Sequence, residues 1–320
     1  MNIEVFVKTA DFALTEGSIY ERLRRDPSVE FDPYIFHASL IYDENAKRIL
    51  AGVHREYMDV AQKHQLPILV MADTWRASQE RIDLSQFKGH RVNQDNVQFM
   101  KDLRAEYEES APPIFVGGQI GPRGDAYKPG EALSKAETES FHRVQLDALA
   151  ESGVDLLLAA TLPALTEAQG IASAMSGLGL PYALSFVIRP EGTLLDGTPL
   201  SQAMDIIDNS VSTQPMGYAV NCVHPKVFAS GMSALDKPHL INRIFSFQAN
   251  TANVRPEELN EAKELITEEP DVLAELILDT HRAFHTVFMG GCCGTDTRHI
   301  EQLAGKYRSK HKISAQSETT

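Results

Sequence analysis

The sequence lacks the features that would tie it to membranes, secretion or nucleic acid. It contains no run of about eighteen apolar residues, so we expect no transmembrane helix. Residues 1–5 do not join a basic region to an apolar stretch, and no secretory signal is evident. A surplus of basic residues is absent too, since the formal charge is −14, which argues against general affinity for nucleic acid or anionic membranes. We expect small-molecule partners and a cytoplasmic location.

Two nucleotide-binding signatures are also missing. No Gly-x-Gly-x-x-Gly follows the first apolar run, and no Gly-x-x-x-x-Gly-Lys-Ser/Thr occurs anywhere. The nucleotide-binding versions of an open, doubly wound sheet therefore lack support.

Cysteine is scarce and unevenly placed. Of the three cysteines, Cys292 and Cys293 are adjacent and lie among glycines, whereas Cys222 lies far upstream. Three cysteines make a poor disulfide framework, which fits a reducing compartment. Neighbouring side chains of a strand point to opposite faces, but they can converge where a strand ends and the backbone turns. The flanking glycines allow the positive φ that such a turn needs.

What the chain does contain is an alternation of short apolar runs and longer amphipathic segments. We predict strands at 12–17, 67–74, 113–120, 155–161, 182–188, 217–223, 246–251 and 286–290. We predict helices at 45–63, 93–109, 134–152, 165–176, 200–212, from 225, at 256–284 with an interruption at Pro270, and from about 296 to 307. Eight such units predict a single-domain (β/α)8 TIM barrel over residues 1–308, with a polar, frayed tail at 309–320. The alternative is an open doubly wound sheet.

On this barrel the cysteines meet. Cys222 ends the sixth predicted strand, and Cys292 and Cys293 end the eighth, so all three face the mouth where barrel enzymes keep their sites. Three protein ligands and one open position are typical of a catalytic zinc, and a thiolate set makes magnesium or calcium unsuitable. A substrate thiol, with an ordinary pKa of roughly 8.5, would lose its proton on entering the open position.

The same segments resemble a known family. Gly291-Cys292-Cys293-Gly294, with Asn221-Cys222 upstream, looks like the zinc site of the homocysteine S-methyltransferase family. Weaker similarity lies at 53–57, 72–78, 118–122, 141–149 and 196–200. The resemblance implies a (β/α)8 barrel, Zn2+ held by the three cysteines, and methyl transfer to a thiol. Homocysteine, which would become methionine, is the leading acceptor.

Two strand ends depart from the family pattern. The family's first strand ends in Asp-Gly-Gly-Met-Gly-Thr, whereas this chain has Glu16 and Gly17 followed by Ser-Ile-Tyr-Glu. The family's fourth strand ends in Glu-Thr-x-Pro, with the glutamate available to a substrate ammonium, and Ala160 stands at that place here. Glu16 keeps one carboxylate, but Ala160 cannot bind a cation. Zinc chemistry is therefore better supported than homocysteine as the acceptor.

Other polar residues at strand ends complete the predicted site. We predict substrate contacts from five residues: Glu16, Gly17, Asp73, Asn221 and Asn250. Four histidines could also bind a metal, but we favour surface or helix-capping roles for them: His224, His281, His285 and His299. We expect Trp75 to pack at the rim, and the acidic segment 257–269 to be a solvated helix face.

The preferred hypothesis is a zinc-dependent S-methyltransferase that takes a methyl group from a sulfonium or quaternary-amine donor and gives it to a zinc-bound thiol. S-methylmethionine, S-adenosylmethionine and betaine are donors of this kind. The alternatives are methylation of a different small thiol, a non-catalytic barrel that binds zinc or an amino acid, and dithiol redox chemistry at Cys292 and Cys293. The oligomeric state stays open.

Overall fold

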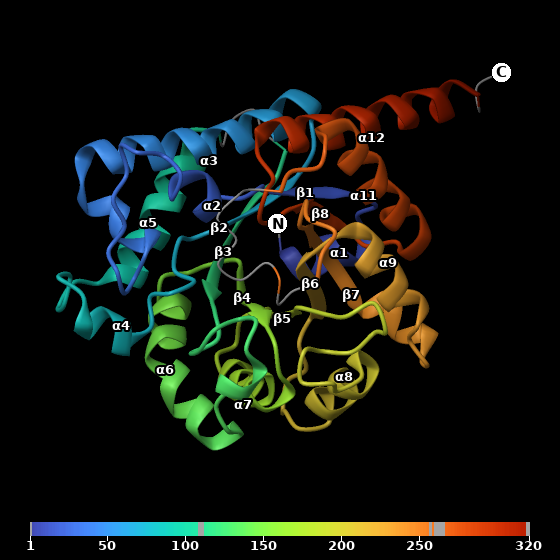
Figure 1. Cartoon of the computed structure of the whole chain (residues 1–320). Helices are drawn as coiled ribbons and strands as arrows, with labels where there is room; N and C mark the ends of the chain where they lie inside the picture. Colours follow the sequence, from blue (N-terminus) through green and yellow to red (C-terminus); the bar gives the residue numbers. More distant parts are fainter. Residues whose placement is uncertain (1, 108–111, 256–257, 259–265, 318–320) are drawn as a thin grey trace.

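The strands form a closed parallel barrel in sequence order, β1 to β8 (Figure 1). The computed structural model describes residues 2–107, 112–255, 258 and 266–317. The strands are β1 Ala13–Thr15, β2 Ile68–Met71, β3 Ile114–Ile120, β4 Leu156–Leu162, β5 Tyr182–Phe186, β6 Gly217–Val223, β7 Ile244–Ala249 and β8 Phe288–Gly291. Leu14 of β1 pairs with Met289 of β8 and closes the ring. The predicted (β/α)8 barrel is confirmed, and the open doubly wound sheet is wrong.

Helices surround the barrel as an outer ring (Figure 1). They are α2 Tyr20–Leu23, α3 Glu44–His64, α4 Gln79–Leu84, α5 Val92–Ala105, α6 Lys135–Glu151, α7 Leu165–Ser176, α8 Leu200–Asp208, α9 Pro225–Ser233, α11 Pro270–Phe284 and α12 Thr297–Ser317. Short 3-10 turns occur at His37–Tyr42, Pro129–Glu131 and Pro238–Arg243. None of the described helices is long and apolar enough to cross a bilayer.

Three described helices were not predicted, namely α2, α4 and a first helix at the start of the chain. Helix α1, Ile3–Thr9, lies close to the barrel axis (Figure 1) and covers the amino-terminal ends of the strands. The ring of Phe6 lies 5.0 Å from Phe115 and 5.6 Å from Phe288, between ring centroids. Because this apolar helix fills the lower end of the barrel, the space left for a ligand lies at the opposite, carboxyl-terminal end.

The carboxyl-terminal third departs from the prediction in two places. Helix α12 continues through Ser317 rather than ending near Tyr307, so residues 309–317 are helical. Within the predicted helix at 256–284, residues 266–269 are not helical and α11 begins at Pro270. Proline suits this first turn because a missing N–H costs nothing there. Most of the acidic segment 257–269, residues 257 and 259–265, lies outside the described residues.

Candidate active site

A cavity of about 320 Å³ opens at the carboxyl-terminal mouth of the barrel. Every residue predicted for the site lines it: Glu16, Gly17, Asp73, Asn221, Cys222, Asn250, Cys292 and Cys293. These residues come from the ends of β1, β2, β6, β7 and β8, so strand closure brings together positions that lie far apart in sequence. The volume is in the range of small-molecule sites.

The three cysteine sulfurs form one cluster. Cys222 Sγ lies 3.5 Å from Cys293 Sγ, and Cys292 Sγ lies 4.0 Å from Cys293 Sγ. All three sulfurs are within 4.8 Å of one another. Thiolates that hold a tetrahedral ion at 2.3 Å stand about 3.8 Å apart, so the cluster has the spacing that a metal of this kind needs. Among the described residues this is the one group of three or more potential ligands.

Backbone irregularities aim these side chains into the mouth. Cys222 has φ +61°, and the β6–β7 register shifts between Asn221 and Val223. Gly294 has φ +85°, and a Cβ there would collide with the hydroxyl of Thr251. A left-handed conformation at a non-glycine residue is costly, which makes Cys222 a strained position of the kind found at functional sites.

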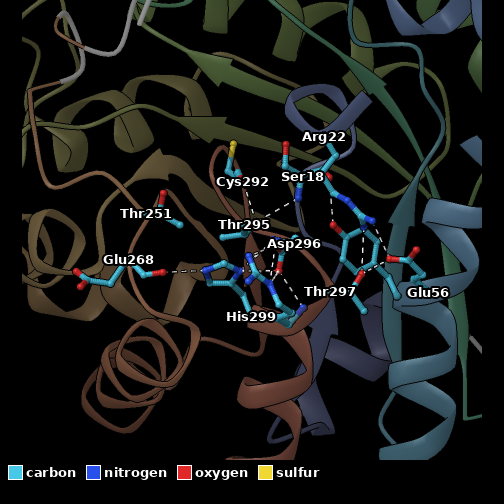
Figure 2. A network of polar contacts seen from close by, with 12 residues as sticks. Ser18, Arg22, Glu56, Thr251, Glu268, Cys292, Thr295, Asp296, Thr297 and His299 are labelled. Carbon is cyan, nitrogen blue, oxygen red and sulfur yellow. Dashed lines mark hydrogen bonds and ion pairs between the residues drawn. The ribbon is translucent and has the colours of Figure 1, made fainter. Parts of the chain in front are cut away.

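A hydrogen-bond network centred on Thr295 holds the loop that carries Cys292 and Cys293 (Figure 2). Thr295 Oγ1 donates to the Cys292 carbonyl at 2.7 Å and accepts from the Ser18 backbone N–H at 3.1 Å. Arg22, one turn beyond Ser18, binds Glu56 of α3 at 2.8 Å. The end of β8 is thereby tied to the β1–α2 loop and to the first large helix.

The thiols affect one another strongly because they are crowded together. Hydrogen bonds from Cys292 and Cys293 lower the pKa of Cys222 well below its usual range. In return, Cys222 raises the pKa of both Cys292 and Cys293. Three thiolates in such a cluster need a cation to balance their charge.

A second wall of the cavity is formed by Glu16, Asp73 and His37, and these residues belong to a buried group of four titratable side chains completed by His54. His54 Nε2 lies 2.9 Å from Asp73 Oδ2, and His54 Nδ1 lies 3.5 Å from Glu16 Oε2. His37 Nε2 lies 3.5 Å from the other Asp73 oxygen. Glu16 Oε2 and His54 Nδ1 are buried without a hydrogen-bond partner in the described structure. The sequence pointed to the two carboxylates but not to the two histidines.

Burial and close contact shift the pKa values of three of these groups. Burial alone would lower the pKa of His54, but Asp73 and Glu16 together raise it to about 10, so its ring is an imidazolium at neutral pH. Burial raises the pKa of Glu16, and His54 opposes that rise. Burial lowers the pKa of His37, which is therefore neutral. The result is an imidazolium that lies between two buried carboxyl groups.

The two asparagines serve different neighbours. Asn221 Oδ1 accepts from Ser185 Oγ at 2.6 Å and from the Thr161 N–H at 2.9 Å, while its Nδ2 donates to Thr161 Oγ1 at 2.8 Å. Its polar atoms are thus engaged within the protein. Asn250 Nδ2 points at Cys222 Sγ, 3.7 Å away.

Small residues shape the rest of the mouth. A Cβ at Gly17 would stand 2.7 Å from the Tyr57 hydroxyl, so glycine is needed there. Ala160 is fully buried, and its carbonyl accepts from the indole of Trp75 at 3.4 Å. Trp75 lines the cavity, as its predicted place at the rim suggests, and the Arg76 guanidinium lies 4.2 Å from its ring centroid.

Tyr127 is a site residue that sequence reasoning missed. Its hydroxyl lies 3.1 Å from Cys222 Sγ, and its side chain lines the cavity. Burial and the neighbouring sulfurs raise the pKa of Tyr127 well above its usual range, so the phenol keeps its proton. Either atom could donate in this contact, and the phenol is the donor when Cys222 is a thiolate, which has no proton. The two residues are 95 positions apart in sequence, and no local pattern pairs them.

The four candidate histidines do not join the sulfur cluster. His224 and His285 cap helices α9 and α11, as predicted. His299 binds Asp296 and the Glu268 carbonyl at the start of α12 (Figure 2). His281 is buried, which makes a surface role wrong for it. Its ring binds the backbone carbonyl of residue 286 at 3.0 Å.

Fold and site together define a (β/α)8 enzyme with three thiols gathered at the mouth of the barrel, a group that could hold a metal ion. The chain matches the family model described as homocysteine S-methyltransferase over residues 13–307. It belongs to that family and is a methyltransferase.

Individual relatives support the same assignment. The chain is 27% identical over 246 residues to homocysteine S-methyltransferase YbgG of Bacillus subtilis, covering 71% of this chain and 74% of that protein. It is 21% identical over 320 residues to betaine–homocysteine S-methyltransferase 1 of Bos taurus, covering 93% of this chain and 72% of that protein. The metallated form of the homocysteine methyltransferase MmuM from Escherichia coli has the same fold, with a TM-score of 0.74 and 19% identity. The match covers 94% of this chain and 98% of that structure.

Proposed function

We propose that this protein is a zinc-dependent S-methyltransferase that moves a methyl group from a sulfonium or quaternary-amine donor to a small thiol, with homocysteine the leading acceptor. The observation that carries the proposal is the convergence of Cys222, Cys292 and Cys293 at one wall of the mouth cavity. Three soft sulfur donors favour zinc over oxygen-binding metals. An ion held there would offer an open position that removes the proton of an incoming thiol.

The reaction needs two partners in one cavity. The acceptor sulfur forms a new bond to the methyl carbon while the bond from that carbon to the positive sulfur or nitrogen of the donor breaks. The bonding electron pair stays on the departing sulfur or nitrogen, so that atom leaves without its positive charge. Because no proton moves at the carbon, the protein contributes by holding sulfur, methyl carbon and leaving atom in line.

The acidic wall supplies a second recognition point, and we assign it to the acceptor. Glu16 and Asp73 line the cavity, and His54 lies between their two carboxyl groups. A primary ammonium has N–H groups to donate to the Glu16 side chain at the cavity lining. A fully methylated onium has none. An amino-acid thiol such as homocysteine therefore suits this wall, even though Ala160 offers no carboxylate.

The donor is better matched by the aromatic lining. Three aromatic side chains border the cavity: Tyr20, Trp75 and Tyr127. Aromatic faces attract alkylated cations. A cationic donor fits this lining better than an anionic or neutral one.

The test is methyl transfer by reduced, zinc-loaded protein to a panel of thiols: homocysteine, cysteine, 4-mercaptobutanoate and 2-mercaptoethanol. Each is paired with S-methylmethionine, S-adenosylmethionine and betaine. We expect at least one pair to give thioether product, and Cys292→Ala to lose both zinc and product. Product formed at the full rate by metal-free Cys292→Ala would disprove the mechanism.

The remaining hypotheses are outcomes of the same panel. Stoichiometric zinc without product from any pair would indicate a barrel that binds but does not catalyse. Reversible loss of two thiols on mild oxidation, with no bound metal, would indicate dithiol chemistry. Product only with a thiol other than homocysteine would reassign the acceptor and leave the methyltransferase class in place.

A further inference from the structure

We propose that Tyr127 is a positioning residue for Cys222: its hydroxyl donates a hydrogen bond that holds this sulfur in the cluster and keeps it from taking the methyl group itself. The inference rests on the proposed function, because it requires a metal on the three cysteines and an electrophilic methyl donor in the same cavity.

The hydrogen bonds at the cluster are unevenly distributed. Cys222 Sγ faces the Tyr127 hydroxyl at 3.1 Å and the Asn250 amide at 3.7 Å. Within the described part of the chain, the hydrogen bonds of the Cys292 and Cys293 sulfurs involve only the cysteines themselves. Cys222 is thus the one sulfur of the three that is contacted by donors from other segments.

The position of Tyr127 is fixed by its loop, the connection between β3 and α6. The Tyr127 backbone N–H donates to Asp125 Oδ1 at 2.9 Å. Buried Arg76 donates through Nη1 to two carbonyl oxygens of the same loop, at 2.7 and 2.8 Å. Buried Glu167 accepts a backbone N–H of this loop at 2.7 Å. A loop anchored at several points can hold the phenol in place whether or not a substrate is present.

The hydrogen bond matters because a cysteine ligand is itself a nucleophile. If Cys222 attacked the donor, a sulfur–methyl bond would form there, the methyl–onium bond would break, and the donor would leave uncharged with the electron pair. The resulting thioether is a poor ligand, and the enzyme would be inactivated. A hydrogen bond to a thiolate engages one of its lone pairs and withdraws electron density, which lowers its nucleophilicity. Methyl transfer is then directed to the acceptor sulfur.

The test compares alkylation of the zinc-loaded wild type, Tyr127→Phe and Tyr20→Phe. Tyr20 is the matched control, because it also lines the cavity but its hydroxyl makes no hydrogen bond to a cluster sulfur in the described structure. Each protein is treated with iodoacetamide, and carbamidomethylation of each cysteine is followed by peptide mass spectrometry. We expect Cys222 to react about threefold to tenfold faster in Tyr127→Phe. Cys292, Cys293 and the Tyr20→Phe protein should keep the wild-type rates.

A rate at Cys222 that does not change in Tyr127→Phe would overturn the proposal, as would an equal rise at all three cysteines, which would indicate general loosening. A second measurement keeps the shape of the tyrosine side chain at position 127. With 3-fluorotyrosine, a more acidic phenol, at position 127 and Co2+ at the cluster, the sulfur-to-cobalt charge-transfer band should move to higher energy. An unmoved band contradicts the hydrogen bond. Failure of the wild type to bind Zn2+ or Co2+ contradicts the proposed function instead.

Discussion

The imidazole of His54 lies against the carboxylate of Asp73, with Nε2 2.9 Å from Oδ2 and both side chains buried. On its other side the ring faces Glu16 at 3.5 Å. One cation from helix α3 thus lies between carboxylates at the ends of β1 and β2. This contact joins the outer layer of helices to the barrel at the wall of the mouth cavity.

Replacing His54 with alanine should destabilise the fold by about 3–5 kcal/mol, because two buried carboxylates would lose their counter-ion. Urea unfolding near neutral pH measures the change. His90→Ala is the control, since His90 is exposed, and it should stay close to wild type. Equal stability of the two variants would contradict an ionised His54.

The same pair predicts how stability depends on pH. The pKa of His54 is raised from 6.5 to about 10, so its stabilising contribution is complete below about pH 6.5 and is lost as pH rises through about 10. Glu16, Asp73 and His37 are the titratable groups that face it. Between about pH 7 and about pH 10.5 the unfolding free energy of the wild type should therefore fall more than that of His54→Ala. If the unfolding free energies of the two proteins changed in parallel with pH, His54 would be neutral.

Glu16→Gln should weaken recognition of an acceptor's amino group. We expect KM for homocysteine to rise about tenfold to hundredfold, because a charged hydrogen bond is lost, and KM for 4-mercaptobutanoate, which lacks the ammonium, to stay unchanged. Glu21→Gln is the control, since Glu21 lines the same cavity but pairs with Arg24 at 2.7 Å. Equal effects on both thiols would place the ammonium elsewhere.

Gly294→Ala should damage the cysteine loop more than backbone strain alone explains. Gly294 has φ +85° and a Cβ there would collide with Thr251, whereas Gly179 has φ +70° and open space around it. Gly179→Ala should cost about 1–2 kcal/mol and leave metal content unchanged. Gly294→Ala should cost more and lower the zinc content, as measured by metal analysis. A zinc content of Gly294→Ala equal to that of the wild type would show that the cysteine loop tolerates the added methyl group.

Phe6→Ala should destabilise the barrel by about 3–5 kcal/mol, because Phe6 fills the amino-terminal end of the barrel against Phe115 and Phe288. Val5→Ala, on the exposed face of the same helix, should change stability by less than about 1 kcal/mol. Thermal and urea unfolding measure both. A small effect of Phe6→Ala would mean that α1 does not contribute to the core.

The strands and the cysteine site could be predicted because each leaves a local signal. Buried parallel strands are continuous apolar runs, and parallel order carries Cys222 and Cys293 to the same mouth once the barrel is assumed. Helix α1 was not predicted, because a seven-residue helix has too few turns for a clear periodicity.

The residues that were missed act through contacts distant in sequence. His54 lies within a long amphipathic helix, where a histidine among apolar residues is typical of packing. Its role appears only when folding brings it to Asp73, and Tyr127 meets Cys222 across 95 positions. Side-chain pairs of this kind depend on exact loop paths, which periodicity and composition do not determine.

The central claim is that three cysteines hold a catalytic zinc, and metal analysis of freshly reduced protein tests it most directly. Wild type and the single variants Cys222→Ala, Cys292→Ala and Cys293→Ala are assayed side by side for bound zinc and for methyl transfer to homocysteine. We predict about one zinc per wild-type chain, in keeping with a single three-sulfur cluster, and joint loss of zinc and product in each variant. Methyl transfer that persists in protein stripped of zinc would contradict the account.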